Sequence, residues 1–182
     1  MCEGARQSVM PLSSLLIAVV LAGGGGSPDP LPWDGVTLRR YEDPVARVAF
    51  PIPLTQTVLE SRHFPEAAPE QMTDVFTLVG PQVEEVELGL YRNPKQLGLD
   101  AWVTATLPFL RAPEHTVLPY FALKSRVPAV LFEQPRSSQQ YARRTAVFRL
   151  GERVVVLSCR NIESPRAVAA FEAILGSLEA LP

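Results

Sequence analysis

The clearest pattern of apolar and polar residues lies toward the end of the chain, on both sides of the dipeptide Gly151-Glu152. Residues 141–150 and 153–159 are rich in β-branched and aromatic side chains, and glycine at the first position of a two-residue loop favours a type II′ hairpin. The register that this loop sets pairs Leu150 with Arg153, Phe148 with Val155, and Ala146 with Leu157. Both faces carry apolar residues, which predicts that the hairpin lies inside a sheet covered on both sides.

A helix is predicted after this hairpin. Ser164 is a suitable N-cap, and Pro165 is a suitable first helical residue. The apolar positions that follow recur at helical spacing and form one wide stripe: Ala167, Val168, Phe171, Ile174, Leu175, Leu178 and Leu181. We expect this helix to pack on one face of the hairpin, with Cys159 beneath it as an unreactive core residue.

Shorter apolar runs predict further strands, at residues 33–41, 45–52, 74–79, 84–91, 117–123 and 127–132. Proline should end the second of these strands at Pro51 and Pro53, and should confine the last two to sheet edges. Residues 61–73 are expected to form a loop, and a short helix should begin at Asp100 as its N-cap and end near Pro108. This order of elements predicts an α+β fold, an antiparallel β-sheet flanked by helices.

The first residues have the order of a secretory signal. Arg6 precedes an apolar run of 11 residues from Leu12 to Ala22, and small residues follow. A membrane-spanning helix needs about 20 residues, so this run is too short to be one. We therefore expect residues 1–24 to be a signal peptide, 25–32 a flexible tether and 33–182 a single domain, exported to the periplasm or the cell envelope and without an integral membrane span.

The end of the apolar run resembles a bacterial lipobox, but Gly24 stands where the lipid-bearing cysteine would be. No lipid attachment is expected at Gly24. An uncleaved signal that anchors the chain remains an alternative. Cleavage would leave Cys159 as the only cysteine, and so no internal disulfide.

Composition and charge narrow the functional classes. With 182 residues, 47% hydrophobic residues and a formal net charge of −2, the chain is globular, and nucleic-acid binding is not expected. Charge is nevertheless uneven, because residues 58–91 carry seven acids and one base, whereas residues 136–166 carry seven arginines and two acids. We favour pairing of these segments across one sheet. The alternative is a docking surface for a partner, with the candidate residues Arg143, Arg149, Arg160 and Arg166.

Two segments carry a resemblance to a known family. Residues 50–53 read F-P-I-P, and residues 149–178 begin R-L-G-E-R-V-V-V-L-S-C and end F-E-A-I-L-G-S-L. Together with the order of the elements, over residues 41–181, they resemble the PsbP/DcrB-like superfamily. The resemblance implies a PsbP-like α/β/α sandwich and a binding or assembly module with no family-wide enzymatic activity. The missing lipobox cysteine departs from the lipoprotein members.

The residues that carry chemistry are few. His63 and His115 fall in segments expected to be loops, and no G-x-S-x-G elbow surrounds Ser61 or another serine. Metal-ligand spacings and phosphate-binding loops are also missing, and Glu85 and Glu87 fit the solvated face of a strand. We therefore predict no catalytic residues, no metal site and no cofactor.

These observations favour a non-enzymatic exported module that binds or assembles another envelope protein. Two alternatives remain open. One is a small-ligand carrier with a cleft between the sheet and the middle helix, near Trp102 and Phe109. The other is a hydrolase that uses Cys159 or a loop histidine.

Overall fold

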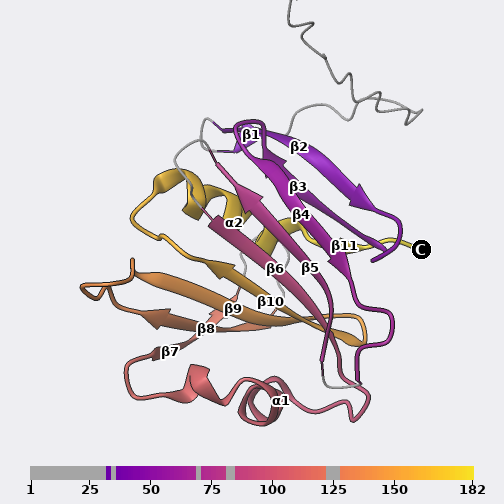
Figure 1. Cartoon of the computed structure of the whole chain (residues 1–182), viewed down its shortest axis with the longest axis vertical. Helices are drawn as coiled ribbons and strands as arrows, with labels where there is room; N and C mark the ends of the chain where they lie inside the picture. The colour runs from indigo at the N-terminus through magenta and orange to yellow at the C-terminus, as the bar shows by residue number, and fades with distance from the viewer. Residues whose placement is uncertain (1–31, 34–35, 69–70, 81–84, 122–127) are drawn as a thin grey trace, which may run out of the picture.

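The middle and C-terminal parts of the chain build one large antiparallel sheet (Figure 1). The computed structural model describes residues 32–33, 36–68, 71–80, 85–121 and 128–182. Within these residues the sheet runs, from edge to edge, through β4 (Thr57–His63), β5 (Met72–Val79), β6 (Glu85–Arg92), β10 (Arg153–Cys159), β9 (Arg143–Leu150), β8 (Pro128–Gln134) and β7 (Thr116–Phe121). The step from β6 to β10 places the C-terminal hairpin in the middle of the sheet.

A smaller sheet joins the N-terminal strands to the last short strand. Its order is β1 (Pro32–Trp33), β2 (Val36–Asp43), β3 (Val48–Pro53) and β11 (Glu179–Ala180). The helices of the described residues are α1 (Leu99–Thr106), the short 3-10 helix η1 (Pro108–Arg111) and α2 (Pro165–Ser177). In Figure 1, α1 covers one side of the large sheet, whereas α2 and the small sheet lie on its other side.

The structure confirms the predicted hairpin and its register. Leu150 pairs with Arg153, Phe148 with Val155 and Ala146 with Leu157. Gly151 has a φ of +61°, and Glu152 is not among the described residues with positive φ, as a type II′ turn requires. Strands β6 and β8 flank the hairpin, so it is interior to the sheet.

Two cores cover the two faces of the hairpin. One contains Phe148, Val155 and Leu157 together with residues of α2 and β3. The other contains Val147 and Val154 together with residues of α1. The alternation of β9 and β10 therefore supplies both cores, which confirms the expected α+β arrangement of a sheet flanked by helices.

Helix α2 begins as predicted, with the Ser164 side chain accepting a hydrogen bond from the Ala167 N–H. The centre of its apolar stripe is buried, and Phe171 is fully buried. The helix ends at Ser177, so Leu178 and Leu181, which were expected to continue the stripe, lie beyond it and are only partly buried. The helix packs mainly against β3 and then against β10 and β6, so it lies between the two sheets instead of on the hairpin alone. The sequence pattern indicated the apolar stripe of this helix. It did not indicate that the small sheet, through β3, also packs against that stripe. Cys159 is a fully buried member of the same core, where it was expected.

Two predictions about proline and strand edges were wrong. Pro51 lies inside β3, since β11 pairs only with Val48 and Ala49 and leaves the rest of that edge of β3 without a described neighbour. β8 lies between β7 and β9, so of the two predicted edge strands only β7 is one. Pro128 is tolerated because it is the first residue of β8.

Two predicted boundaries also shift. The sequence pattern does not predict β4, and this strand runs into the expected loop as far as His63, which pairs with Asp74 of β5. Residues 61–63 therefore belong to a strand and not to a loop. The N-cap of α1 is Gly98, and Asp100 lies in the first turn, where a carboxylate favours the positive end of the helix dipole. The expected signal peptide, 1–24, and the tether up to residue 31 lie outside the described residues.

Tyrosine burial gives the fold a dependence on pH. Tyr91 packs against Trp102, with ring centroids 5.2 Å apart. Burial, and after it the Glu87 carboxylate, raise the pKa of the Tyr91 hydroxyl above its ordinary value of 10.0. Burial and Asp43 raise the pKa of Tyr41 in the same direction.

The folded chain therefore holds these phenol protons more tightly than the unfolded chain does. We expect the free energy of unfolding to be level just below pH 10.0 and to fall as the pH rises through and above that value. Urea titrations at several pH values on both sides of this point should show the fall, and Tyr91→Phe should make it shallower. An unchanged slope in Tyr91→Phe would contradict this explanation.

Candidate functional site

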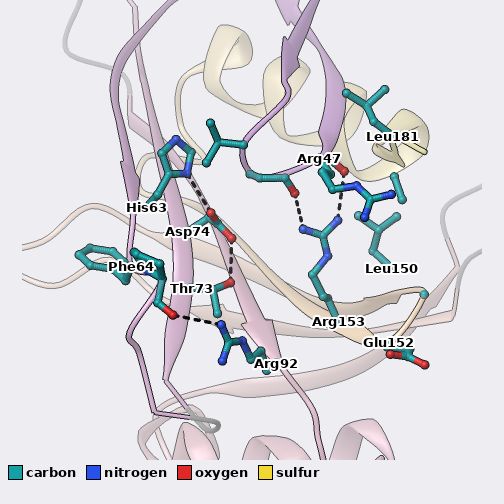
Figure 2. A pocket seen from close by; sticks show the side chains of 15 residues that line it. Arg47, His63, Phe64, Thr73, Asp74, Arg92, Leu150, Glu152, Arg153 and Leu181 are labelled. Carbon is teal, nitrogen blue, oxygen red and sulfur yellow. Dashed lines mark hydrogen bonds and ion pairs between the residues drawn. The ribbon is translucent and has the colours of Figure 1, made fainter.

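A groove opens where five parts of the chain meet (Figure 2). Its walls are the turn between β2 and β3 at residues 44–47, the facing ends of β4 and β5, the end of β6 at Arg92, the hairpin turn at Gly151, and Ala180 with Leu181. Its volume is about 710 Å³. We call it the arginine groove, because Arg47, Arg92 and Arg153 all line it.

Arg153 begins β10 and crosses the groove to the turn at 44–47. Its Nη1 donates to the carbonyl oxygen of Ala46 at 2.5 Å, and its Nη2 donates to the carbonyl oxygen of Arg47 at 3.2 Å. Burial lowers the pKa of Arg153, an effect that Asp74 opposes and Arg47 reinforces. The ordinary pKa of arginine is so high that the side chain stays charged. The charged, half-buried side chain of Arg153 therefore links the hairpin to the small sheet through two hydrogen bonds, a link that we call the clamp.

The turn that Arg153 clamps has an unusual backbone. Arg47 has a φ of 54°, in the left-handed region that residues other than glycine seldom adopt. Its carbonyl oxygen also accepts a hydrogen bond from the backbone N–H of Leu181 at 2.9 Å. Backbone strain of this kind persists only where the surrounding contacts fix it, and it occurs often at functional sites.

The other two arginines also donate to main-chain oxygens. Arg47 Nε donates to the main-chain oxygen of Pro182, the last residue, at 3.2 Å, and Arg92 Nη2 donates to the carbonyl oxygen of Pro65 at 3.3 Å. Within the described residues, neither Arg92 nor Arg153 forms an ion pair with a carboxylate.

A polar network lies along one wall of the groove. His63 Nδ1 is 2.9 Å from Asp74 Oδ1, and Thr73 Oγ1 donates to Asp74 Oδ2 at 2.7 Å. On its other side, His63 Nε2 is 3.4 Å from Ser61 Oγ and 3.6 Å from Asp43 Oδ2. Asp43 belongs to β2, so the network joins the small sheet to β4 and β5 of the large one.

This network contains the residue types of a Ser-His-Asp triad but not its chemistry. Ser61 Oγ donates to Asp43 Oδ2 at 3.1 Å, a shorter contact than the one to His63 Nε2. Acyl transfer needs hydrogen-bond donors beside the nucleophile to stabilise an oxyanion, whereas here a carboxylate lies beside it. Ser61 is also not among the residues that line the groove. The arrangement is suited to holding two sheets together.

The other residues singled out from the sequence lie elsewhere. His115 is partly buried in the turn before β7, and its Nδ1 is buried without a hydrogen-bond partner among the described residues. Trp102 is 2% exposed and packs against Tyr91, so it fills the core instead of lining the expected cleft, whereas Phe109 is 59% exposed. The described residues include no group of three or more side chains placed to hold a metal ion.

Pairing within the chain explains part of the uneven charge. Arg160 bonds to Glu85 at 3.0 Å and to Glu87 at 2.5 Å, which joins the basic segment to the acidic one across β6 and β10. Arg144 likewise bonds to Glu133 and Glu172. The Arg160 contacts confirm the favoured interpretation for that residue, whereas the partners of Arg144 lie outside the acidic segment 58–91.

The four candidate partner-surface residues do not form one cluster. Arg143 begins β9 and Arg149 lies near its other end, roughly 20 Å away along the strand. Arg149 donates to the carbonyl oxygens of Gln96 and Leu97. Arg160 is paired as described above, and Arg166 is exposed in the first turn of α2. A partner surface at these residues stays a prediction.

Sequence reasoning missed the arginine groove. Arg153 was recognised only as the partner of Leu150 in the hairpin, yet its guanidinium bonds Ala46, 107 positions earlier in the chain. No local pattern indicates such a contact. The one available signal is the turn at 44–47 itself, where Asp43 precedes exposed Val45 and could have been recognised as an Asx turn.

No family model and no curated protein matches the chain. Solved structures do match. The solution structure of cyanobacterial PsbP (CyanoP) from Synechocystis sp. PCC 6803 aligns with a TM-score of 0.50 and 12% identity, over 88% of this chain and 98% of that one.

The fold is PsbP-like.

A second match is the crystal structure, at 1.50 Å resolution, of a protein from Bacteroides thetaiotaomicron VPI-5482, with a TM-score of 0.49 and 12% identity. It aligns over 79% of this chain and 48% of that chain, so the present chain spans about half of its length. The PsbP-like fold confirms the fold class that the resemblance of residues 41–181 implied.

Proposed function

We propose that this protein is a non-enzymatic binding or assembly module of the cell envelope, and that it holds a segment of another protein in the arginine groove. The observation that carries the proposal is the meeting of apolar and cationic side chains in one open hollow. Val45 is 68% exposed and Phe64 is 37% exposed, and both line the groove together with the three arginines. Exposed apolar residues gathered beside charged groups mark interaction sites.

A non-enzymatic role agrees with the polar network. His63 and Asp74 are oriented as in a triad, but the Ser61 hydroxyl is bonded to Asp43, and the carboxylate beside it would repel an oxyanion. The PsbP-like fold supports the same view.

Export is the second part of the proposal, and the order of charged, apolar and small residues in 1–24 supports it. No helix in the described part of the chain is long and apolar enough to cross a membrane.

Site-specific crosslinking tests both parts. A photoreactive residue replaces Phe64 in the groove or, as the control, exposed Phe109 beside α1, and the full chain is expressed in cells that can export it. We expect one defined protein of the envelope fraction to crosslink at position 64 and not at 109, and mass spectrometry to place the N-terminus of the product near residue 25. The same adduct at both positions, or none at 64, would exclude the groove. An intact Met1 in a cytosolic fraction would exclude export.

A small-ligand carrier is the second candidate. The volume of the groove, about 710 Å³, falls in the range of small-molecule sites. Thermal melting with a panel of small anionic compounds tests it, because a ligand of the folded state raises the melting temperature.

A further inference from the structure

The charges of the arginine groove indicate the chemistry of its occupant. Resting on the proposed function, we infer that the groove binds an acidic segment of a partner protein. Carboxylates of that segment would meet Arg47, Arg92 and Arg153, and apolar side chains would pack on Val45 and Phe64.

The three guanidinium groups have N–H donors that form no hydrogen bond in the described structure. Each hydrogen bond that they form in the described structure ends on a main-chain oxygen, of Ala46, Arg47, Pro65 or Pro182. A guanidinium has more N–H donors than these bonds use, and its preferred partner is a carboxylate bound through two parallel bonds. Arg92 and Arg153 thus form no ion pair with a carboxylate of the described residues, and Arg47 bonds only to the main-chain oxygen of the last residue, Pro182.

The two carboxylates of the groove do not neutralise these cations by direct pairing. Asp74 is bonded to His63 and Thr73. Glu152 is exposed on the hairpin turn and forms no ion pair within the described residues. In Figure 2 its carboxylate lies away from the Arg153 guanidinium. A carboxylate from outside the chain can therefore reach Arg92 and Arg153 without displacing an existing ion pair.

The shape of the groove fits an extended segment. A second hollow of about 540 Å³ shares His63, Phe64 and Pro65 with the first, so the depression continues past the Phe64 ring toward Met72. Phe64 stands between the two hollows, where it can contact apolar side chains of a chain that passes through both.

The layout of the donors favours carboxylates over phosphate. Phosphate sites gather backbone N–H groups of a helix N-terminus or a nest around one anion. The groove is lined by strands and turns, and its arginines come from three elements, the turn at 44–47, β6 and β10. Separate cations along an open groove suit several carboxylates spaced along one segment.

Nuclear magnetic resonance tests the inference directly. The probe is a capped peptide of about eight residues with equal numbers of leucine and aspartate, which suits strand-like recognition. The matched control peptide has asparagine in place of aspartate. We expect the acidic peptide to shift the Nε–Hε signals of Arg47, Arg92 and Arg153 in a saturable way, and the asparagine peptide to bind about tenfold more weakly or not at all.

Variants of the chain provide the matched comparison. Arg92→Gln should weaken binding of the acidic peptide about tenfold, and raised salt should weaken it further. Arg143→Gln and Arg166→Gln remove cations outside the groove and should leave the affinity unchanged. Arg153→Gln would also remove the hydrogen bonds that hold the turn at 44–47, so it is not a clean test. Arg92→Gln is therefore the variant that tests the inference, and its melting temperature must first be shown to match that of the wild type.

Three results would overturn the inference. They are equal affinity for the aspartate and asparagine peptides, no loss of affinity in Arg92→Gln, and saturable shifts with inorganic phosphate but not with the acidic peptide. None of these results affects crosslinking at position 64, which detects a partner of any chemistry. A crosslinked partner without preference for the acidic peptide rejects only this inference, whereas the absence of a crosslink rejects the proposed function.

Discussion

Replacing Phe171 with alanine should remove about 3–5 kcal/mol from the free energy of unfolding, which for a domain of this size is about 5–15 kcal/mol in total. The Phe171 side chain is fully buried in the core between α2, β3 and β10. Its loss leaves a cavity that two sheets share, and neither sheet can close it without moving relative to the other. Urea titration of the variant and the wild type measures the difference.

The control for this variant is Arg166→Ala on the same helix. Arg166 is exposed and forms no hydrogen bond or ion pair with another described residue, so the change should stay within about 0.5 kcal/mol. The sequence pattern places Glu172 on the outer side of α2 as well, but Glu172 bonds to Arg144 at 3.4 Å and is a less suitable control. Equal midpoints for Phe171→Ala and Arg166→Ala would mean that α2 is not docked by this side chain.

Asp43→Ala should cost about 1–3 kcal/mol, because it leaves buried donors without an acceptor. Asp43 is 6% exposed. Its Oδ1 accepts hydrogen bonds from the N–H groups of Val45 and Ala46 at 3.0 and 2.8 Å, and its Oδ2 accepts one from Ser61. One carboxylate thus fixes the turn at 44–47 and attaches it to β4.

Asp43→Asn separates these two roles. The asparagine amide keeps one oxygen that can accept from Val45 and Ala46, so its loss of stability should be clearly smaller than that of Asp43→Ala. Both variants are compared by urea titration. Equal losses in the two variants would show that the negative charge, and not the turn, accounts for the cost.

Sequence analysis succeeded where the structure depends on nearby residues. The hairpin register follows from Gly151 and the alternation around it, and the start of α2 follows from Ser164 and Pro165. These signals are local, since a turn or a cap is decided by a few consecutive residues.

The analysis failed where distant segments compete or combine. The expected loop at 61–73 is partly strand because β5 pairs with Ser61 and His63. The small sheet exists because β11, at the end of the chain, pairs with β3 near its beginning. The groove is assembled from five such parts of the chain, so none of its three arginines stands out in its own stretch of sequence.

The clamp between Arg153 and the turn at 44–47 has a consequence for the order of folding. The bonded residues Arg153 and Ala46 are 107 positions apart, and α2, which covers β3, comes later still. During synthesis, β2 and β3 emerge first, and their apolar face is buried only after the last part of the chain has been made. Long-range contacts of this kind slow folding and prolong the exposure of such surfaces. The arginine groove consequently takes shape only once the last residues of the chain are in place, so a product that ends before Ala180 lacks one of its walls.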